Sequence, residues 1–183
     1  MRITGGKAKG RHLSSLKGRS IRPTSDKVRE AIFNIIGQDI TGLKVLDLFA
    51  GTGSLGIEAL SRGAVFSLFI DNSHLAVKVI QKNLTLCDYQ NSGFVLKKDL
   101  RKGLPTGHPL CRKKFDLVFI DPPYGKNLIH PVLGEFSHGE ILVPTAIIVI
   151  ESFKKDDSLL LSNDFHLVVT RIYGKTKIDI YRK

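Results

Sequence analysis

The sequence predicts an α/β fold with a mostly parallel sheet of seven strands, helices on both faces and a small basic N-terminal extension. Two observations predict it. Five short apolar runs alternate with helical patterns between residues 43 and 152, and such runs are typical of parallel strands covered on both faces. The C-terminal stretch "FHLVVTRIYGKTKIDIYRK" instead alternates on each side of Gly174-Lys175. This second pattern predicts an antiparallel hairpin that closes one edge of the sheet with an antiparallel C-terminal strand.

The individual elements follow in a regular order along the chain. "RPTSDKVREAIFNIIG" predicts the first helix, with Thr24 or Ser25 as N-cap and Gly37 as the stop. The five apolar strands are expected at "KVLDLF", "VFSLFID", "GFVLKKD", "KFDLVFID" and "AIIVIES". The connecting helices are expected at "SLGIEALSRG", "HLAVKVIQKNLTLC" and "NLIHPVLGEF", the last of them broken by Pro131.

The chain is strongly basic, and its charge is unevenly distributed. Its 28 lysines and arginines outnumber 17 aspartates and glutamates, which gives a formal net charge of +11 and an isoelectric point near 9.8. Within residues 1–30, nine basic residues stand against two acids. Because neutralised phosphates release condensed counterions, this composition favours nucleic acid over a membrane surface as the partner.

The remaining composition indicates a cytoplasmic protein. Cys87 and Cys111 have no metal-binding spacing and the histidines are scattered, so we expect reduced thiols and no metal. The N-terminal "MRITGGKAKGRHL" has no apolar leader segment, and no apolar run is long enough to cross a membrane.

A glycine-rich loop follows the first predicted strand. In "VLDLFAGTGSLGIEAL", Gly51, Gly53 and Gly56 lie between strand and helix, where glycines permit a tight turn and a close approach of the backbone to a ligand. Asp71 lies twenty residues after Gly51, at the end of the second strand, where an acid can accept hydrogen bonds from ribose hydroxyls. Taken alone, the pattern fits either a dinucleotide or S-adenosylmethionine, since both carry an adenosine ribose.

Two further acids favour S-adenosylmethionine. Asp47 lies at the end of the first strand, directly ahead of the glycine loop, where a carboxylate repels a pyrophosphate but can bind the ammonium group of a methionine moiety. Asp99 ends the third strand in "LKKDL" and can accept a hydrogen bond from the adenine amino group. Parallel strands bind ligands at their carboxyl ends, so these acids and Asp71 predict one site for an adenosyl ligand.

A second candidate loop ends the fourth strand in "FIDPPYGKN". Two prolines cannot continue a sheet and hold the backbone nearly rigid. In methyl transfer to an exocyclic amine, Asp121 can accept one amino hydrogen and a carbonyl of Pro122 or Pro123 the other, while Tyr124 stacks on the base. The segment therefore predicts the place where a planar amine acceptor is held.

These motifs resemble those of a known family. The glycine loop followed by Asp-Pro-Pro-Tyr is similar to the amino-methyltransferase branch of the class I S-adenosylmethionine-dependent methyltransferases, which have a Rossmann-like fold. "MRITGGKAKGRHL", "RPTSDKVREAIFNIIG", "DPPYGKN" and "IYGKTKI" together closely resemble the RsmD-type bacterial family, nearly end to end. The resemblance implies transfer of a methyl group from S-adenosylmethionine to the exocyclic N2 of one guanine in 16S ribosomal RNA, acting on the small subunit.

The resemblance also implies roles for individual residues. The cofactor-binding residues would be Asp47, Ala50, Gly51 and Gly53 at the methionine end, Asp71 at the ribose and Asp99 near the adenine. The catalytic residues at the target base would be Asp121, Pro122, Pro123 and Tyr124. The segment "RPTSDKVRE" would cover the cofactor pocket and position the RNA, which makes Arg22, Lys27 and Arg29 candidate contacts to RNA phosphates. One departure is visible, because Ser73 stands where relatives usually carry a second acid.

We expect a monomer in which a basic extension, residues 1–36, packs on a methyltransferase domain, residues 37–183. A DNA or RNA adenine-N6 or cytosine-N4 methyltransferase is an alternative, because it shares the Asp-Pro-Pro-Tyr motif, although the chain lacks room for a DNA target-recognition domain. A nucleotide-binding or RNA-binding module without catalysis is a further alternative. The glycine loop would also suit a nicotinamide-dependent oxidoreductase, but that function would give no role to Asp47 or to the second loop.

Overall fold

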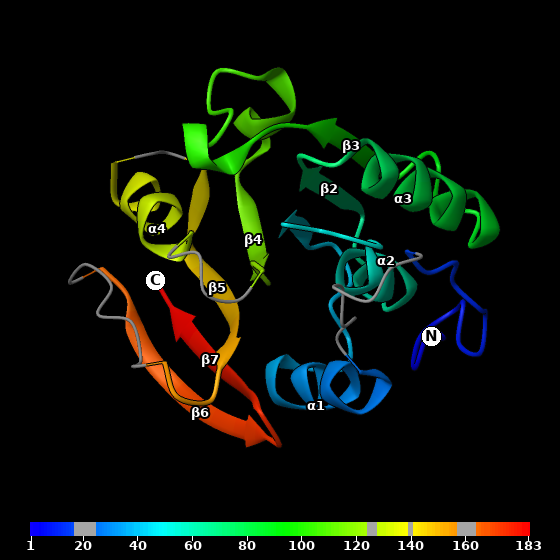
Figure 1. The fold of residues 1–183 in the computed structure, drawn as a ribbon, viewed down its shortest axis with the longest axis horizontal. Coiled ribbons are helices and arrows are strands. Elements are labelled where there is room, and N and C mark those ends of the chain that lie inside the picture. Colours follow the sequence, from blue (N-terminus) through cyan, green and yellow to red (C-terminus); the bar gives the residue numbers. More distant parts are fainter. Residues whose placement is uncertain (17–24, 124–127, 139–140, 157–163) are drawn as a thin grey trace.

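A computed structural model describes residues 1–16, 25–123, 128–138, 141–156 and 164–183. Its centre is a seven-stranded sheet with the strand order β3-β2-β1-β4-β5-β7-β6, and helices lie on both sides of it (Figure 1). The predicted fold class is thereby confirmed. No helix in the described part of the chain is long and apolar enough to cross a membrane.

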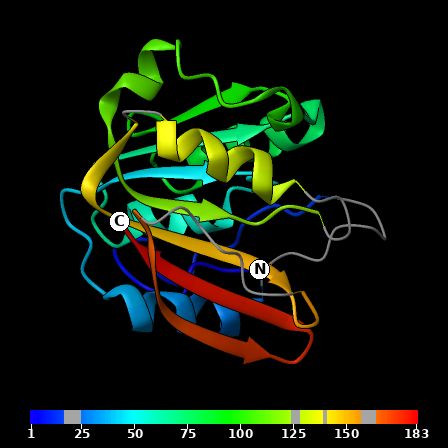
Figure 2. The ribbon, with the colours of Figure 1, turned by 90° about the vertical axis from the view of Figure 1, so that its left-hand side faces the viewer.

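Strands β1 to β5 run parallel to one another, and β7 runs antiparallel to them. The parallel strands are β1 (Lys44–Leu48), β2 (Phe66–Asp71), β3 (Gly93–Lys97), β4 (Phe115–Ile120) and β5 (Leu142–Phe153). Strand β7 (Thr176–Arg182) is antiparallel both to β5 and to β6 (His166–Tyr173). The predicted hairpin turns at Gly174, whose φ of 63° favours glycine. Figure 2 shows the strands stacked from β3 to β6, with α4 over the face nearer the viewer.

Each face of the sheet packs against its own helices. Helices α1 (Asp26–Ile36), α2 (Ser54–Ser61) and α3 (His74–Leu86) share one apolar cluster with alternate residues of the strands, such as Val45 and Phe119. Helix α4 (Ile129–His138) shares the other cluster with the residues between them, such as Leu46 and Val118. The period-2 alternation of a strand thus fills two separate cores.

The structure corrects two expectations about local structure and identifies the N-cap residue of α1. The helix is not broken at Pro131, because α4 begins at Ile129 and Pro131 lies in its first turn. The backbone N–H groups of a first turn have no intrahelical partner, so a proline there removes no hydrogen bond of the helix. Strand β5 begins four residues earlier than expected, at Leu142, across a register shift between Phe115 and Leu117. Ser25, rather than Thr24, caps α1 by accepting a hydrogen bond from the Val28 N–H.

The connection from β3 to β4 contains two short 3₁₀ helices, η1 (Leu100–Lys102) and η2 (Pro109–Lys113). Its buried residues join the α4 side of the core: Leu100, Leu104 and Cys111. The Leu104 N–H donates to the Glu135 carboxylate of α4 at 2.8 Å. The connection is therefore attached to the body of the protein by apolar packing and by a hydrogen bond to a helix.

The N-terminal arm forms a small hairpin, with a β-bridge between Arg2 and His12. Its apolar residues Ile3 and Leu13 are buried in the cluster around α1 and α2. A buried carboxylate, Glu58 of α2, anchors the arm by accepting hydrogen bonds from two of its backbone N–H groups. The described part of the arm, residues 1–16, is thus packed against the body of the molecule.

The expected RNA contact at Arg29 is contradicted by the structure. The Arg29 side chain is 0% exposed, and its Nε donates to Glu58 Oε2 at 3.0 Å. The same guanidinium pairs with Asp26 at 2.9 Å and donates to the Arg2 carbonyl. A buried cation must be paired to offset its desolvation, so Arg29 joins α1 to α2 and to the arm.

Candidate active site

The candidate site lies along the carboxyl edge of the parallel strands. The expected residues follow the strand order there: Asp99 after β3, Asp71 at the end of β2, Asp47 and the glycine loop at β1, and Asp121 after β4. Strands β1 and β4 are neighbours, but the chain leaves β1 toward β2 and reaches β4 from β3. Ligands bind at such a switch point in α/β sheets, which places the glycine loop and Asp121 on its two sides.

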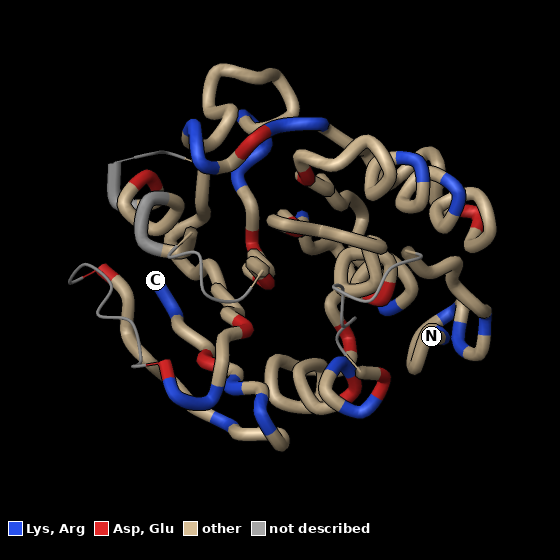
Figure 3. The backbone as a smooth tube through the Cα atoms, viewed as in Figure 1, with Lys and Arg blue, Asp and Glu red and all other residues tan. Residues whose placement is uncertain are grey.

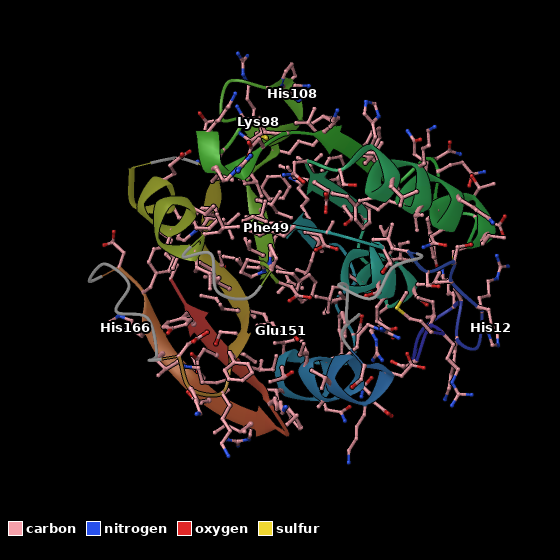
Figure 4. The ribbon with its side chains drawn as sticks, viewed as in Figure 1. His12, Phe49, Lys98, His108, Glu151 and His166 are labelled. Atoms are coloured by element: carbon pink, nitrogen blue, oxygen red, sulfur yellow. The ribbon has the colours of Figure 1, made fainter. Side chains whose placement is uncertain are left out.

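The loop after β1 is built from left-handed backbone conformations. Phe49, Gly51 and Gly53 have φ angles of 58°, 55° and 76°. The left-handed region is costly for a bulky residue such as Phe49, and strain of this kind clusters at functional sites. Figure 4 shows Phe49 in the middle of the molecule, while His12, His108 and His166 lie at well-separated edges.

Hydrogen bonds hold the loop in place. The Gly51 N–H donates to Asp71 Oδ2 at 2.9 Å, and the Ala50 N–H donates to the Ile70 carbonyl at 3.1 Å. The Asp71 carboxylate also accepts from the Ser73 N–H at 2.8 Å. Asp71 therefore orders the backbone of the loop, and the same carboxylate is positioned at the strand end where a ribose is expected.

Close packing between α2 and β2 requires the third glycine. A Cβ atom at Gly56 would lie 2.3 Å from the Phe69 ring and 2.7 Å from the Ser67 hydroxyl. This is the role that the third glycine of a G-x-G-x-x-G motif has between helix and sheet.

Burial strongly perturbs the pKa of Asp47. Its side chain is 2% exposed, and its Oδ2 accepts from the Gly56 N–H at 2.9 Å. Burial raises the pKa of Asp47 to about 8, the Gly56 hydrogen bond opposes this rise, and the nearby Asp71 adds to it. A carboxyl so destabilised in its charged form gains from a cation brought next to it, as the expected ammonium partner would be.

The structure explains why a serine, and not the second acid usual in relatives, stands at position 73. Ser73 is the N-cap of α3, and its hydroxyl accepts a hydrogen bond from the Ala76 N–H. Serine is among the preferred residues at this position. Ser73 therefore stabilises the start of α3, next to Asp71, instead of providing a second carboxylate.

Asp99 is already engaged within the chain. Its carboxylate caps η1 and forms a two-point ion pair with Arg101, with a shortest distance of 2.7 Å. The hydrogen bond from the Arg101 guanidinium lowers the pKa of Asp99 to about 2. Arg101 must share this carboxylate with an adenine amino group if Asp99 is to bind one.

Asp121 lies immediately after β4, at the level where β1 gives way to the glycine loop. The register pairs Leu48 with Ile120, and the Asp121 N–H points at the Leu48 carbonyl at 3.5 Å. Pro122 is buried and Pro123 is exposed. On the other side of β4 lies the buried Glu151 of β5, labelled in Figure 4, since Ile120 pairs with Ile150.

Three of the expected roles remain predictions for different reasons. Tyr124 and Arg22 lie outside the described residues. Lys27 is exposed on α1, so a contact to RNA phosphate is sterically open to it.

Sequence reasoning missed Asn83, which joins the arm to the glycine loop. Asn83 is 0% exposed and its amide donates to the Thr52 carbonyl at 2.9 Å and to the Ser14 carbonyl at 3.1 Å. Its carbonyl accepts from the Ser14 N–H at 2.7 Å. The one available signal was a polar residue on the apolar face of a predicted helix, next to Leu84.

Comparison with known proteins identifies the family. A family model described as conserved hypothetical protein 95 matches residues 1–182. The Haemophilus influenzae protein named ribosomal RNA small subunit methyltransferase D is 33% identical over 184 residues, which cover 100% of this chain and 93% of that protein. The chain belongs to the RsmD-type methyltransferase family.

Two further similar proteins agree with this assignment. Bacillus subtilis YlbH, assigned as an rRNA methyltransferase, is 35% identical over 185 residues, covering 100% of this chain and 99% of that protein. The solved structure of Escherichia coli yhhF, assigned as a methyltransferase, matches with a TM-score of 0.85 and 27% identity, covering 100% and 97% of the two chains. The names of YlbH and of the Haemophilus influenzae protein support methylation of ribosomal RNA, and that of yhhF supports methyl transfer.

A more distant structure shows the shared fold. SMU.776, solved in complex with SAH, matches with a TM-score of 0.65 at 14% identity, and the match covers 90% of this chain and 50% of that one.

Proposed function

We propose that this RsmD-type protein transfers a methyl group from S-adenosylmethionine to the exocyclic N2 amine of a guanine in small-subunit ribosomal RNA. The observation that carries the proposal is the position of Asp121, Pro122 and Pro123 beside the glycine loop, across the β1–β4 switch point. Relatives named for methylation of small-subunit ribosomal RNA support this substrate.

The residues along the carboxyl edge suit S-adenosylmethionine. The buried carboxyl of Asp47 lies at the start of the glycine loop, and Asp71 lies at the end of β2, where its carboxylate accepts the Gly51 N–H. We assign Asp47 and the backbone around Ala50, Gly51 and Gly53 to the methionine end, Asp71 to the ribose hydroxyls and Asp99 to the adenine. When bound, the cofactor supplies a methyl group already activated by its sulfonium, so the protein needs no nucleophile of its own.

The protein would then act mainly by positioning the acceptor. A guanine N2 lone pair is delocalised into the ring, so the amine must be turned toward the methyl group. We assign this task to Asp121 and the prolyl carbonyls as hydrogen-bond acceptors, with Tyr124 stacking on a base drawn out of its helix. As the new C–N bond forms, the bond between the methyl carbon and the cofactor sulfur would break and the nitrogen must lose a proton, and we assign its acceptance to Asp121.

The test is transfer of labelled methyl groups to unmodified small ribosomal subunits and to free 16S ribosomal RNA, followed by nucleoside digestion and mass spectrometry. An Asp121→Ala variant is compared with Asp164→Ala, which removes an exposed carboxylate just before β6. We expect N2-methylguanosine from the unaltered protein and from Asp164→Ala, and a loss of at least about 100-fold from Asp121→Ala. Cofactor affinity, measured by calorimetry, should stay similar in all three proteins.

Two outcomes would overturn parts of the proposal. N6-methyladenosine or N4-methylcytidine as the product would contradict the guanine assignment. Cofactor binding without transfer to subunits, free RNA or DNA would contradict the enzymatic function and leave a binding module.

A further inference from the structure

The net charge of the protein resides in two segments. The first is residues 1–30, with nine basic residues against two acids. The second is residues 97–114, the end of β3 and its connection to β4, where seven basic residues stand against Asp99 alone. These segments carry +7 and +6 of a total of +11, so all other residues together carry −2. A charge this uneven indicates two basic segments and not a general basic background.

We call the second segment the β3–β4 basic surface. Its seven basic residues are Lys97, Lys98, Arg101, Lys102, Arg112, Lys113 and Lys114. All are exposed except Lys98, which is half-buried. Arg101 is engaged by Asp99, whereas the other six form no ion pair with any residue that the structure describes. Their charge is therefore available to a partner.

The fold places these cations along the β3 side of the molecule. Figure 3 shows their backbone positions together along the top of the view, in the region of β3, η1 and η2. The surface begins at Lys97 and Lys98, immediately before Asp99 of the candidate cofactor site, and ends at Lys114, immediately before β4. The Lys97 end of the surface therefore lies at the carboxyl edge of the sheet, whereas its Lys114 end lies at the amino edge, where Lys113 contacts the first residues of β1 and β2.

The backbone that carries the charges is firmly held. Leu100, Leu104 and Cys111 are buried in the core on the α4 side, and Glu135 accepts the Leu104 N–H. These buried residues fix the path of the connection, and the cations project from it. A fixed array of cations loses less conformational freedom on binding than one on a flexible tail.

We propose that the β3–β4 basic surface is a second RNA-binding surface, which contacts phosphates of folded ribosomal RNA flanking the target nucleotide. It would bind the strand on the β3 side of the site, while the arm and α1 bind on the opposite side. The inference rests on the proposed function for the identity of the RNA, but the charge and its placement are properties of this chain. An RNA backbone fits better than an acidic protein because six cations without an ion pair among the described residues follow one connection, and a regular line of phosphates matches such a row.

The test compares two quadruple variants of equal charge. The first is Lys97→Gln, Lys102→Gln, Arg112→Gln and Lys114→Gln, which leaves Arg101 with Asp99 and leaves Lys113 stacked on Phe66 at 5.0 Å. The matched control is Lys78→Gln, Lys82→Gln, Lys154→Gln and Lys155→Gln, all exposed on α3 or after β5. Binding to unmodified 16S ribosomal RNA is measured by filter binding from about 50 to 300 mM KCl without cofactor.

For the first variant we expect the slope of log Kd against log salt to fall by about two to four, and the affinity at about 150 mM KCl to fall at least tenfold. The control should change the slope by less than about one. Similar curves for the two variants would overturn the proposal, because the loss would then reflect net charge alone. Failure of guanine methylation would appear in the nucleoside analysis and not in these binding curves, so the two proposals can fail separately.

Discussion

Replacing Asp47 by asparagine should stabilise the protein without cofactor, increasingly so as the pH rises. The pKa of the buried carboxyl is raised from 3.8 to about 8, so between these values the folded state binds a proton that the unfolded state releases. The contribution of this carboxyl to stability is then fully present below about pH 4 and is lost as the pH rises through about 8. An asparagine side chain at this position would be neutral at every pH and could still accept the Gly56 hydrogen bond.

The magnitude follows from the same carboxyl. Each pH unit between the two pKa values is worth about 1.4 kcal/mol. Between pH 5 and pH 9 the penalty grows only up to about pH 8, so the Asp47→Asn variant should gain about 4 kcal/mol relative to the unaltered protein. Its affinity for S-adenosylmethionine at pH 8 should fall at least about tenfold, since a charged partner for the ammonium group is lost.

Urea unfolding of both proteins without cofactor, at several values between pH 5 and pH 9, measures the stability difference. Calorimetric titration with S-adenosylmethionine measures the second effect. Parallel stability curves for the two proteins would refute the argument, because they would show that Asp47 titrates alike in the folded and unfolded states.

Three further substitutions test contacts that hold the site together. Glu58→Gln should lower the free energy of unfolding by about 3–5 kcal/mol, because two buried arginines lose the buried carboxylate that they share; a change below about 1 kcal/mol in urea unfolding would contradict this. Gly56→Ala should cost about 1–3 kcal/mol in the same assay, because the added methyl group meets the Phe69 ring, and an unchanged midpoint would show that α2 shifts freely. Asn83→Ala should weaken S-adenosylmethionine binding several-fold in calorimetry by releasing the Thr52 carbonyl, and an unchanged affinity would show that the loop holds itself.

The two candidate loops were predictable because their signals are local. Gly51 and Gly53 do adopt left-handed conformations, and two prolines after an apolar run can only end a strand. The cap at Ser73 was equally local, since serine before a helical pattern is a standard N-cap. The resemblance to the family treats Ser73 only as a missing acid, so it does not predict the role of Ser73 at the start of α3.

The basic residues of the first 30 positions show where sequence reasoning fails. Lys27 and Arg29 lie two residues apart on α1, yet one is exposed and the other buried. The difference is made by Glu58, which is 29 residues away from Arg29 in the chain and 3.0 Å away in space. Charge counts treat both cations alike, because only a partner brought close by folding can offset the cost of burying one of them.

The sequence by itself determined the fold class, the order of the strands along the chain and the residue types at both candidate loops. These depend on the period of apolar residues and on the backbone restrictions of glycine and proline, which act within a few residues. Only the tertiary structure decided the burial that raises the pKa of Asp47, the link from Asn83 to the glycine loop and the placement of cations along the β3–β4 basic surface. Burial and the electrostatic environment of a group depend on all its neighbours in space, so they are set only once distant segments have packed together.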